Sequence, residues 1–309
     1  MLVPLQLHAK HWFWVSLAVV ANWPMAVSAL SSVYLVSRPP YMLNYQYVVY
    51  GLEALLWTLT SIINGVFIVA LWQTRTIHRN MRILVITMCA CYIVVGCVRY
   101  SLLYNHFYND KAFSTSIASF IRILQNIFIS AKTSSEIALL AERVCATKLS
   151  NNYETMQSNF IAGVFLISCF IYPAITIPLS TTNIVGPVMF LPLPVIFDIL
   201  SWIFLIILLK INKRSFVTAI DNAKLSQRYQ IVENLRTLRC IRWFLAYSTF
   251  SNAVTVGWYA YFVFYINEVV DNDLYVLYDA TWWLINAISA MVLSLPFLLP
   301  HATLRKRFL

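Results

Sequence analysis

The sequence predicts an all-α integral membrane protein, a bundle of seven transmembrane helices preceded by an additional N-terminal apolar segment. Of its 309 residues, 60% are hydrophobic and 11% are charged, and the mean hydropathy is +0.70. The hydrophobic residues form runs of about 20 residues, the length that an α-helix needs to cross a hydrocarbon core of about 30 Å. Basic residues gather in alternate gaps between these runs, as they do on the cytoplasmic side of membrane proteins.

Seven of the apolar runs are predicted as spans, with ends that are uncertain by a few residues. They cover residues 47–72, 83–104, 117–141, 158–179, 188–209, 243–265 and 274–299. The predicted organisation is an N-terminal segment, 1–46, with an eighth apolar run at 12–36, then the transmembrane bundle, 47–300, and a short basic cytoplasmic tail, 301–309.

The basic residues predict the orientation of the bundle. Sixteen of the 22 Lys and Arg residues lie in the gaps after the first, third and fifth runs or in the tail. The other gaps carry Lys111 beside Asp110, then no base, and then three acids, of which Asp271 is one. Because basic loops stay in the cytoplasm, the bundle should begin outside the cell and the tail should lie inside. The net charge of +10 therefore predicts contact with membrane lipids and not with nucleic acid.

The upstream run, 12–36, allows three interpretations. Val27-Ser28-Ala29 offers small residues for cleavage of a signal peptide, with Lys10 in front of the apolar stretch. The run could also be an uncleaved span, or an apolar cap on the outer surface. We expect it to stay attached, because it is longer than the usual signal core of about 7–15 residues.

The longest polar gap, 210–242, contains a helical pattern. Its apolar positions from Leu225 onward recur every three or four residues, so the sixth helix should begin below the membrane as an amphipathic stalk. The charged residues that lie mostly off this stripe are Arg228, Glu233, Arg236 and Arg239.

Ionisable residues inside the spans are candidates for function, because each is costly to place in lipid. Glu53, Arg99, Arg122 and Asp279 lie toward the outer side, where two acids and two bases could pair. They could form the polar floor or rim of a ligand cavity. For Arg122 and Asp279, which lie near the span ends, we favour the alternative that the side chains extend to the nearby membrane interface.

Three more ionisable residues lie deeper. Lys132 and Glu136 are four residues apart and share a helix face, which predicts an ion pair. Structural pairing is the first expectation, and a locking contact that breaks on activation is the functional alternative. Asp198 has no charged partner in its own helix, so we expect it to face the bundle interior, water or Lys132, and we include it among the cavity candidates.

Prolines mark three of the spans and predict kinks or bends there. They are Pro173 and Pro178, Pro192 and Pro194, and Pro296 and Pro300.

Motifs of catalysis are absent from the sequence, so we do not expect an enzyme. It contains no Gly-x-Ser-x-Gly elbow and no phosphate-binding Gly-rich loop. None of the five histidines falls inside the seven spans, which argues against an intramembrane metal site, and we expect no cofactor.

Two cytoplasmic segments carry a family resemblance. The first is Glu142-Arg143-x-x-Ala146-Thr147 at the inner end of the third span, followed by Asn152-Tyr153-Glu154. The second is residues 225–236, which read Leu-Ser-Gln-Arg-Tyr-Gln-Ile-Val-Glu-Asn-Leu-Arg. Together they resemble the nematode serpentine chemoreceptors, class epsilon, which are seven-helix G-protein-coupled receptors. The resemblance covers roughly residues 47–307 in layout and is sharp only at these two segments.

The resemblance implies a receptor in the plasma membrane, in the sensory cilium of chemosensory neurons, with a small-molecule ligand and a heterotrimeric G protein as partners. It gives Glu142 and Arg143 the roles of the acid and arginine in the receptors' acid-Arg-Tyr motif, although Val144 stands where the tyrosine would be. Arg228, Arg236 and Arg239 are expected to join them in coupling to the G protein. Because the chain lacks the inner motifs of rhodopsin-like receptors, their switch mechanics should not be transferred.

The sequence therefore predicts a chemosensory receptor that binds an external cue and signals to a heterotrimeric G protein. The alternative is a polytopic transporter or ligand-gated channel in which Asp198, Lys132 and Glu136 form a polar path. A ligand-evoked current in a cell without G-protein signalling would favour the channel.

Overall fold

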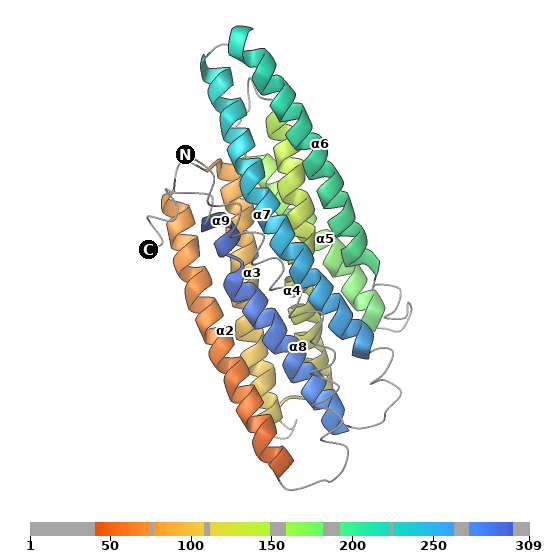
Figure 1. The fold of residues 1–309 in the computed structure, drawn as a ribbon. Helices are drawn as coiled ribbons and strands as arrows, with labels where there is room; N and C mark the ends of the chain where they lie inside the picture. Colours follow the sequence, from red (N-terminus) through yellow and green to blue (C-terminus); the bar gives the residue numbers. More distant parts are fainter. Residues whose placement is uncertain are drawn as a thin grey trace. The chain divides into compact units, whose positions relative to one another are not determined.

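The computed structural model describes residues 41–74, 77–107, 112–148, 159–181, 192–222, 225–262 and 272–298. Most of these residues are helical, and none of them lies in a β-strand. The described residues form seven long helices and one short helix, which are drawn in Figure 1. They are α2 (Tyr41–Gln73), α3 (Arg79–Phe107), α4 (Thr115–Lys148), α5 (Asn159–Thr181), α6 (Pro192–Asn222), α7 (Leu225–Tyr261), α8 (Asn272–Val292) and α9 (Leu295–Leu298).

The chain divides into two compact units, Met1–Val49 and Tyr50–Leu309. Within the smaller unit, the structure describes the start of α2, residues 41–49. The upstream run, 12–36, and the tail, 301–309, lie outside the described residues. Every contact given below belongs to the larger unit.

Each predicted span overlaps one long helix, which confirms the all-α membrane fold. Within the described ranges, α2, α3, α5, α6 and α8 are long and apolar enough to cross a membrane by length and composition. The spans in α4 and α7 are less apolar because polar residues such as Lys132, Glu136 and Asn252 interrupt them.

Helix α4 contacts four other helices, α3, α5, α6 and α7. Its residues from Lys132 to Glu136 are all buried, and all of them are polar or charged. Polar groups are tolerated in a membrane where they face the protein interior and find partners. The position of α4 among its neighbours therefore explains how its polar segment is accommodated.

Helix α2 has two faces whose residues differ in character. Most of its exposed residues are large and apolar and recur at intervals of three and four residues, as expected of a helix that faces lipid tails. These residues are Leu52, Leu55, Leu59, Ile62, Val66 and Val69. The buried face includes polar groups that bond to α8: Thr60 Oγ1 donates to the carbonyl of Ala287 at 2.9 Å, and Asn64 Nδ2 donates to that of Ala290 at 3.1 Å.

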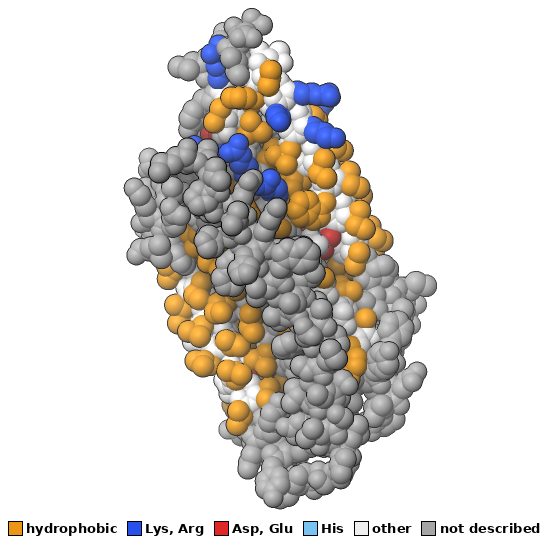
Figure 2. Space-filling model, in the orientation of Figure 1, with side chains coloured by type: hydrophobic (Ala, Val, Ile, Leu, Met, Phe, Trp, Pro, Cys, Tyr) orange, Lys and Arg blue, Asp and Glu red, His pale blue; other side chains and the backbone are white. Residues whose placement is uncertain are grey.

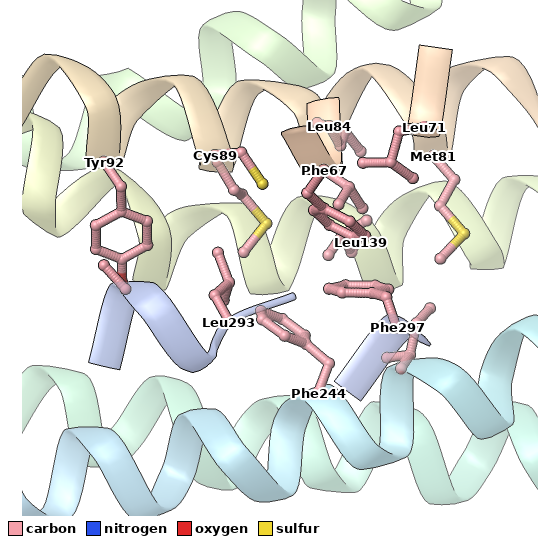
Figure 3. Packing of buried hydrophobic residues seen from close by; sticks show 14 of the residues in the cluster. Phe67, Leu71, Met81, Leu84, Cys89, Tyr92, Leu139, Phe244, Leu293 and Phe297 are labelled. Atoms are coloured by element: carbon pink, nitrogen blue, oxygen red, sulfur yellow. The ribbon is translucent and has the colours of Figure 1, made fainter. Parts of the chain in front are cut away.

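The hydrophobic core is closed at the inner ends of the helices by an aromatic residue of α9. The ring of Phe297 lies between Phe67 of α2 and Phe244 of α7, with centroid separations of 6.2 and 5.2 Å (Figure 3). Leu139 of α4 and Leu293 belong to the same cluster. The short helix thus contributes to the core between distant parts of the chain.

The last predicted span, 274–299, is not one continuous helix. Helix α8 ends at Val292, and α9 begins at Leu295, just before Pro296. Proline disfavours helical geometry in the residue before it and removes a backbone donor, so a break at this place is expected. The carbonyl of Ser294 accepts from the amides of Phe297 and Leu298, both at 3.1 Å, which restarts the helical turn.

The other prolines in the described part of the spans do not end their helices, and Pro300 lies outside the described residues. Helix α5 continues through Pro173 and Pro178. Helix α6 begins at Pro192, and Pro194 lies in its first turn, where the missing amide donor has no intrahelical partner to lose.

Helices α6 and α7 run past the ends of the other long helices at the end where they are joined (Figure 1). The stalk predicted for α7 is present as its first residues, from Leu225. The continuation of α6 from Lys210 to Asn222 was not predicted, although Ile211, Phe216 and Val217 supply apolar groups there. Helices α6 and α7 are in contact with each other.

Lys and Arg side chains gather toward this same end of the visible face in Figure 2, and hydrophobic side chains cover much of the remaining described surface. The exposed bases of the two extensions are Lys210, Lys213, Arg214, Arg236, Arg239 and Arg242. This separation of charge from apolar surface agrees with a helical bundle that crosses a membrane and exposes a basic end.

Candidate functional site

An outer network of three charged residues joins α2, α3 and α8. Arg99 Nε donates to Oε1 of Glu53 at 2.5 Å, and Arg99 Nη2 donates to Oε2 of Glu53 at 3.1 Å and to Oδ2 of Asp279 at 2.8 Å. Glu53 is fully buried and Arg99 is 2% exposed, whereas the Asp279 side chain is 29% exposed. One guanidinium thus serves two carboxylates, as its fork of donors allows.

Aromatic residues surround the outer network. Trp283 Nε1 donates to Oδ1 of Asp279 at 3.1 Å, and the Arg99 guanidinium carbon lies 5.1 Å from the centroid of the Trp283 ring. Trp57 packs against Trp283 with a centroid separation of 6.4 Å. The arginine is therefore held by charge, hydrogen bonds and a cation–π contact.

A layer of stacked rings continues from Asp279 along α7 and α8. Tyr278 stacks on Phe262 at 4.4 Å and on Trp258 at 5.9 Å between ring centroids. Tyr259 contacts Trp282 at 5.9 Å. Aromatic faces and a partly exposed carboxylate are the kinds of groups that contact small molecules in binding sites.

Arg122 is the fourth outer residue that the sequence singles out, and the structure does not bring it to the network. Its side chain is exposed on the outer part of α4. Asp279, by contrast, binds Arg99, so its carboxylate is directed to the network even though part of it remains exposed.

A central cluster joins α4, α6 and α7 through Lys132, Glu136, Asp198, Ser248 and Asn252. Lys132 Nζ lies 3.5 Å from Oε1 of Glu136 and donates to Oδ1 of Asn252 at 2.8 Å. Asn252 Nδ2 donates to both Asp198 oxygens, at 3.0 and 3.2 Å, and Ser248 Oγ donates to Glu136. All five residues are buried, so the cluster replaces water with bonds between side chains.

Asn252 and Ser248 were not singled out from the sequence, yet they connect the charged residues of the central cluster. Asn252 binds Lys132 and Asp198 at the same time, because its amide both accepts and donates. The available signal was their spacing: two polar residues four positions apart in an apolar span share one helix face.

An inner cluster lies near the C-terminal end of α4 and contains His78, Glu142, Arg143 and Asn234. Arg143 forms a two-bond ion pair with Glu142, and both residues are buried. Arg143 Nη1 also donates to Oδ1 of Asn234 on α7 at 2.9 Å, and His78 Nδ1 lies 3.4 Å from Glu142 Oε1. Both segments that carry the family resemblance therefore contribute to one cluster.

The stalk arginines differ from Arg143 in their surroundings. Arg236 and Arg239 are exposed and Arg228 is half-buried, whereas Arg143 is 2% exposed. Arg236 and Arg239 therefore present their guanidinium groups at the surface of the stalk.

Two cysteines near the inner end are weak candidates for reactive thiols. Burial raises the pKa of the Cys240 thiol to about 11. Burial and the neighbouring Glu142 carboxylate also raise the pKa of Cys145. Both thiols are therefore largely protonated at neutral pH, and the protonated form is a poor nucleophile. Among the described residues, no group of three metal-ligating side chains comes together.

Comparison with protein families decides between a receptor and the alternatives. The model of the Sre G protein-coupled chemoreceptor family matches residues 25–296, most of the 309-residue chain. The chain belongs to the Sre G protein-coupled chemoreceptor family. It is thus a chemosensory receptor in a receptor family and not in an enzyme family, and the transporter or channel alternative is not favoured.

Membership of the Sre family implies small-molecule ligands and coupling to a G protein in general terms. The match begins at residue 25, inside the upstream run, and so extends further toward the N-terminus than the resemblance that begins near residue 47. No curated protein matches the chain.

Proposed function

We propose that this Sre-family receptor binds its cue at the outer network and signals to a heterotrimeric G protein through the inner cluster. The observation that carries the proposal is the bond of Arg143 to Asn234, since it joins the two resemblance segments across 91 residues. Helix α7 supplies Asn234 to the inner cluster, Asn252 to the central cluster and Trp258 to the outer aromatic layer. A displacement of α7 by a ligand would therefore change all three levels.

The proposed ligand site consists of Glu53, Arg99 and Asp279 with the adjacent aromatic rings. Asp279 is the partly exposed member, so it offers a polar contact to an entering molecule. Arg122 would lie at the rim, where its exposed side chain can meet ligand or lipid headgroups. Asp198 would act below the site, through the central cluster, with the pair Lys132 and Glu136.

The proposed coupling surface is the inner end of α4 together with the α7 stalk. Because Arg143 is buried against Glu142 and Asn234, the receptor must loosen this cluster before the guanidinium can meet a G protein. Selection of an open state by the ligand would supply the energy for this step. The exposed bases Arg236 and Arg239, with Arg228, would speed the encounter with an acidic partner surface.

The test is the variant Arg143→Ala, assayed as second-messenger output per receptor at the cell surface. If Arg143 couples to the G protein, output should fall at least tenfold, which corresponds to about 1.4 kcal/mol. The exposed Arg214 on α6 provides a matched control, because Arg214→Ala removes the same charge from an exposed position. Unchanged output per receptor for Arg143→Ala would remove Arg143 from the coupling surface.

A second variant separates coupling from folding. Arg143→Ala leaves the buried Glu142 without its guanidinium partner, so the surface level can fall as well. Asn234→Ala keeps the Glu142–Arg143 ion pair and removes only the bond to α7. We expect this variant to reach the surface and to raise ligand-independent output, because the inner cluster no longer holds α4 and α7 together.

We further propose that the receptor is a class epsilon chemoreceptor of a nematode and resides in the plasma membrane of sensory cilia. The two resemblance segments, at Glu142-Arg143 and residues 225–236, support this assignment. A fluorescent fusion expressed in nematode chemosensory neurons should accumulate in the cilia. Retention of the fusion in internal membranes of neurons that deliver other receptors correctly would argue against it.

A further inference from the structure

The central cluster contains one more acid than base. Glu136 and Asp198 can carry two negative charges, and Lys132 carries one positive charge. Glu136 is 1% exposed, and Asp198 and Lys132 are each 6% exposed, so water cannot compensate for the difference. An unbalanced charge in a low-dielectric interior is strongly unfavourable unless the group is neutralised.

The hydrogen bonds of the cluster indicate where a second positive charge, which would balance the second carboxylate, is bound. Oε1 of Glu136 accepts from Ser248 and faces Lys132, while Oε2 is buried and receives no bond from any described residue. Among the described residues, Asn252 donates to Asp198, and the Asp198 carboxyl group lies within hydrogen-bonding reach of Glu136. Two ionised carboxylates cannot bond to each other, because neither has a hydrogen to donate.

We propose that Glu136 and Asp198 bind one proton between them in the resting receptor. The proton supplies the donor that the unbonded oxygen of Glu136 lacks, and it makes the cluster electrically neutral. Like-charged carboxyl groups that share a site hold a proton in this way, because the second ionisation is opposed by the first charge.

The proton site is built from helices that the proposed signalling motion would separate. Helix α7 supplies both neutral donors, Ser248 and Asn252. Withdrawing α7 would leave the carboxyl groups on α4 and α6 with fewer donors and change their affinity for the proton. By linkage, the proton would then change the equilibrium between resting and active states by the same factor.

The other titratable groups that face the site do not supply the missing charge. Tyr92 of α3 interacts electrostatically with Glu136 and Tyr247, and the Tyr247 hydroxyl donates to the carbonyl of Ser289. Both are phenols, which are neutral when protonated and negative otherwise. Lys132 is the cation of the cluster and already offsets one carboxylate.

Infrared spectroscopy of the purified full-length receptor in lipid nanodiscs tests the proposal. A protonated carboxylic acid has a carbonyl stretch that is separate from those of carboxylates. At neutral pH we expect this band in the wild-type receptor, and we expect Asp198→Asn and Glu136→Gln each to remove one protonated group. Glu233→Gln on the half-buried part of the α7 stalk is the control for loss of a carboxyl group and should leave the band unchanged.

Several results would overturn the proposal. Absence of any protonated-carboxyl band in the wild-type receptor would do so, whether or not the variants fold. A protonated-carboxyl band that keeps its full intensity in both variants would also overturn the proposal. If a sodium ion occupied the site in place of the proton, this band would be absent. The thermal stability of the receptor would then rise with sodium chloride but not with choline chloride. Both substitutions nearly preserve side-chain volume and remove the excess charge, so we expect each to fold, and either one alone suffices for the comparison.

Discussion

At the residue scale, the charges inside the bundle occur as bonded groups and not as isolated ions. Arg99 is shared by Glu53 and Asp279, and Lys132 is shared by Glu136 and Asn252. Such groups are satisfied only while every member is present, because removal of one leaves its partner buried and unpaired. Substitutions at these positions should therefore affect stability before they affect signalling.

Arg99→Met should strongly destabilise the receptor. The change removes the cation between the two carboxylates of the outer network, of which Glu53 is fully buried. Loss of one partner of a buried ion pair costs about 3–5 kcal/mol. Thermal unfolding of the purified receptor measures the effect. Arg122→Met removes the same charge from an exposed position on α4 and should change stability by less than about 1 kcal/mol. Equal effects of the two variants would show that the network is not stabilising.

Lys132→Met and Glu136→Leu should not act independently. Each change leaves the other charged group without its partner at 3.5 Å and should lower the surface level of the receptor. The double variant should restore part of it, with a coupling energy of about 0.5–3 kcal/mol in a double-mutant cycle of thermal stability. Strictly additive effects would remove this pair from the account of the central cluster.

At the scale of elements, Pro296 and Phe297 of the short helix α9 shape the inner end of the bundle. Helix α8 ends at Val292, shortly before Pro296 in α9, and Phe297 of α9 packs against Phe67 of α2 and Phe244 of α7. The inner cluster of α4 and the stalk of α7 lie toward the same end of the helices. The packing of α9 therefore belongs to the structural basis of the coupling surface.

Phe297→Ala should lower stability by about 3–5 kcal/mol, because it removes a ring that is 2% exposed and packed between Phe67 and Phe244. Leu295→Ala, two residues away in the same short helix, is the matched control, since Leu295 is 46% exposed. Thermal unfolding in nanodiscs measures both variants. A loss for Leu295→Ala as large as that for Phe297→Ala would indicate that α9 matters as a backbone segment and not through the buried ring.

At the scale of the whole molecule, the distribution of charge relative to the membrane determines orientation. The basic extensions of α6 and α7, with Arg143 and Lys148 of α4, lie on the side that the sequence assigns to the cytoplasm. The outer network and its aromatic rings lie toward the other side. A receptor that senses an external cue and signals inward requires this arrangement.

Inserted glycosylation sites test the orientation. The chain contains no Asn-x-Ser/Thr acceptor of its own, so each inserted site reports alone. Sites inserted after Lys111 and after Asp271 should be modified in a membrane-insertion assay, because these gaps face the lumen that becomes the outside. A site after Lys224, between α6 and α7, should remain unmodified. Modification at that position would reverse the orientation and contradict the assignment of ligand and coupling ends.

The sequence does not specify how each helix is rotated about its own axis, and this limited the prediction of the site. The spacing of Lys132 and Glu136 was sufficient to expect their contact, because both lie on one helix. The bond of Arg99 to Asp279 spans 180 residues, and no local pattern specifies it. The bonds of Asn252 and Asn234 to residues of α4 depend on which face of α7 packs against that helix.

The sequence by itself determined the membrane class, the positions of the seven apolar runs and the gaps in which the bases gather. These properties depend on how each segment partitions between water and lipid, which is a sum over neighbouring residues. Only the tertiary structure decided which buried charges share partners, where the last helix breaks and how far α6 continues past the end of its predicted span. Those outcomes depend on contacts between helices. An apolar helix face can pack against lipid or against another helix with little difference in hydrophobic free energy, so the apolar pattern of a span does not specify its neighbours.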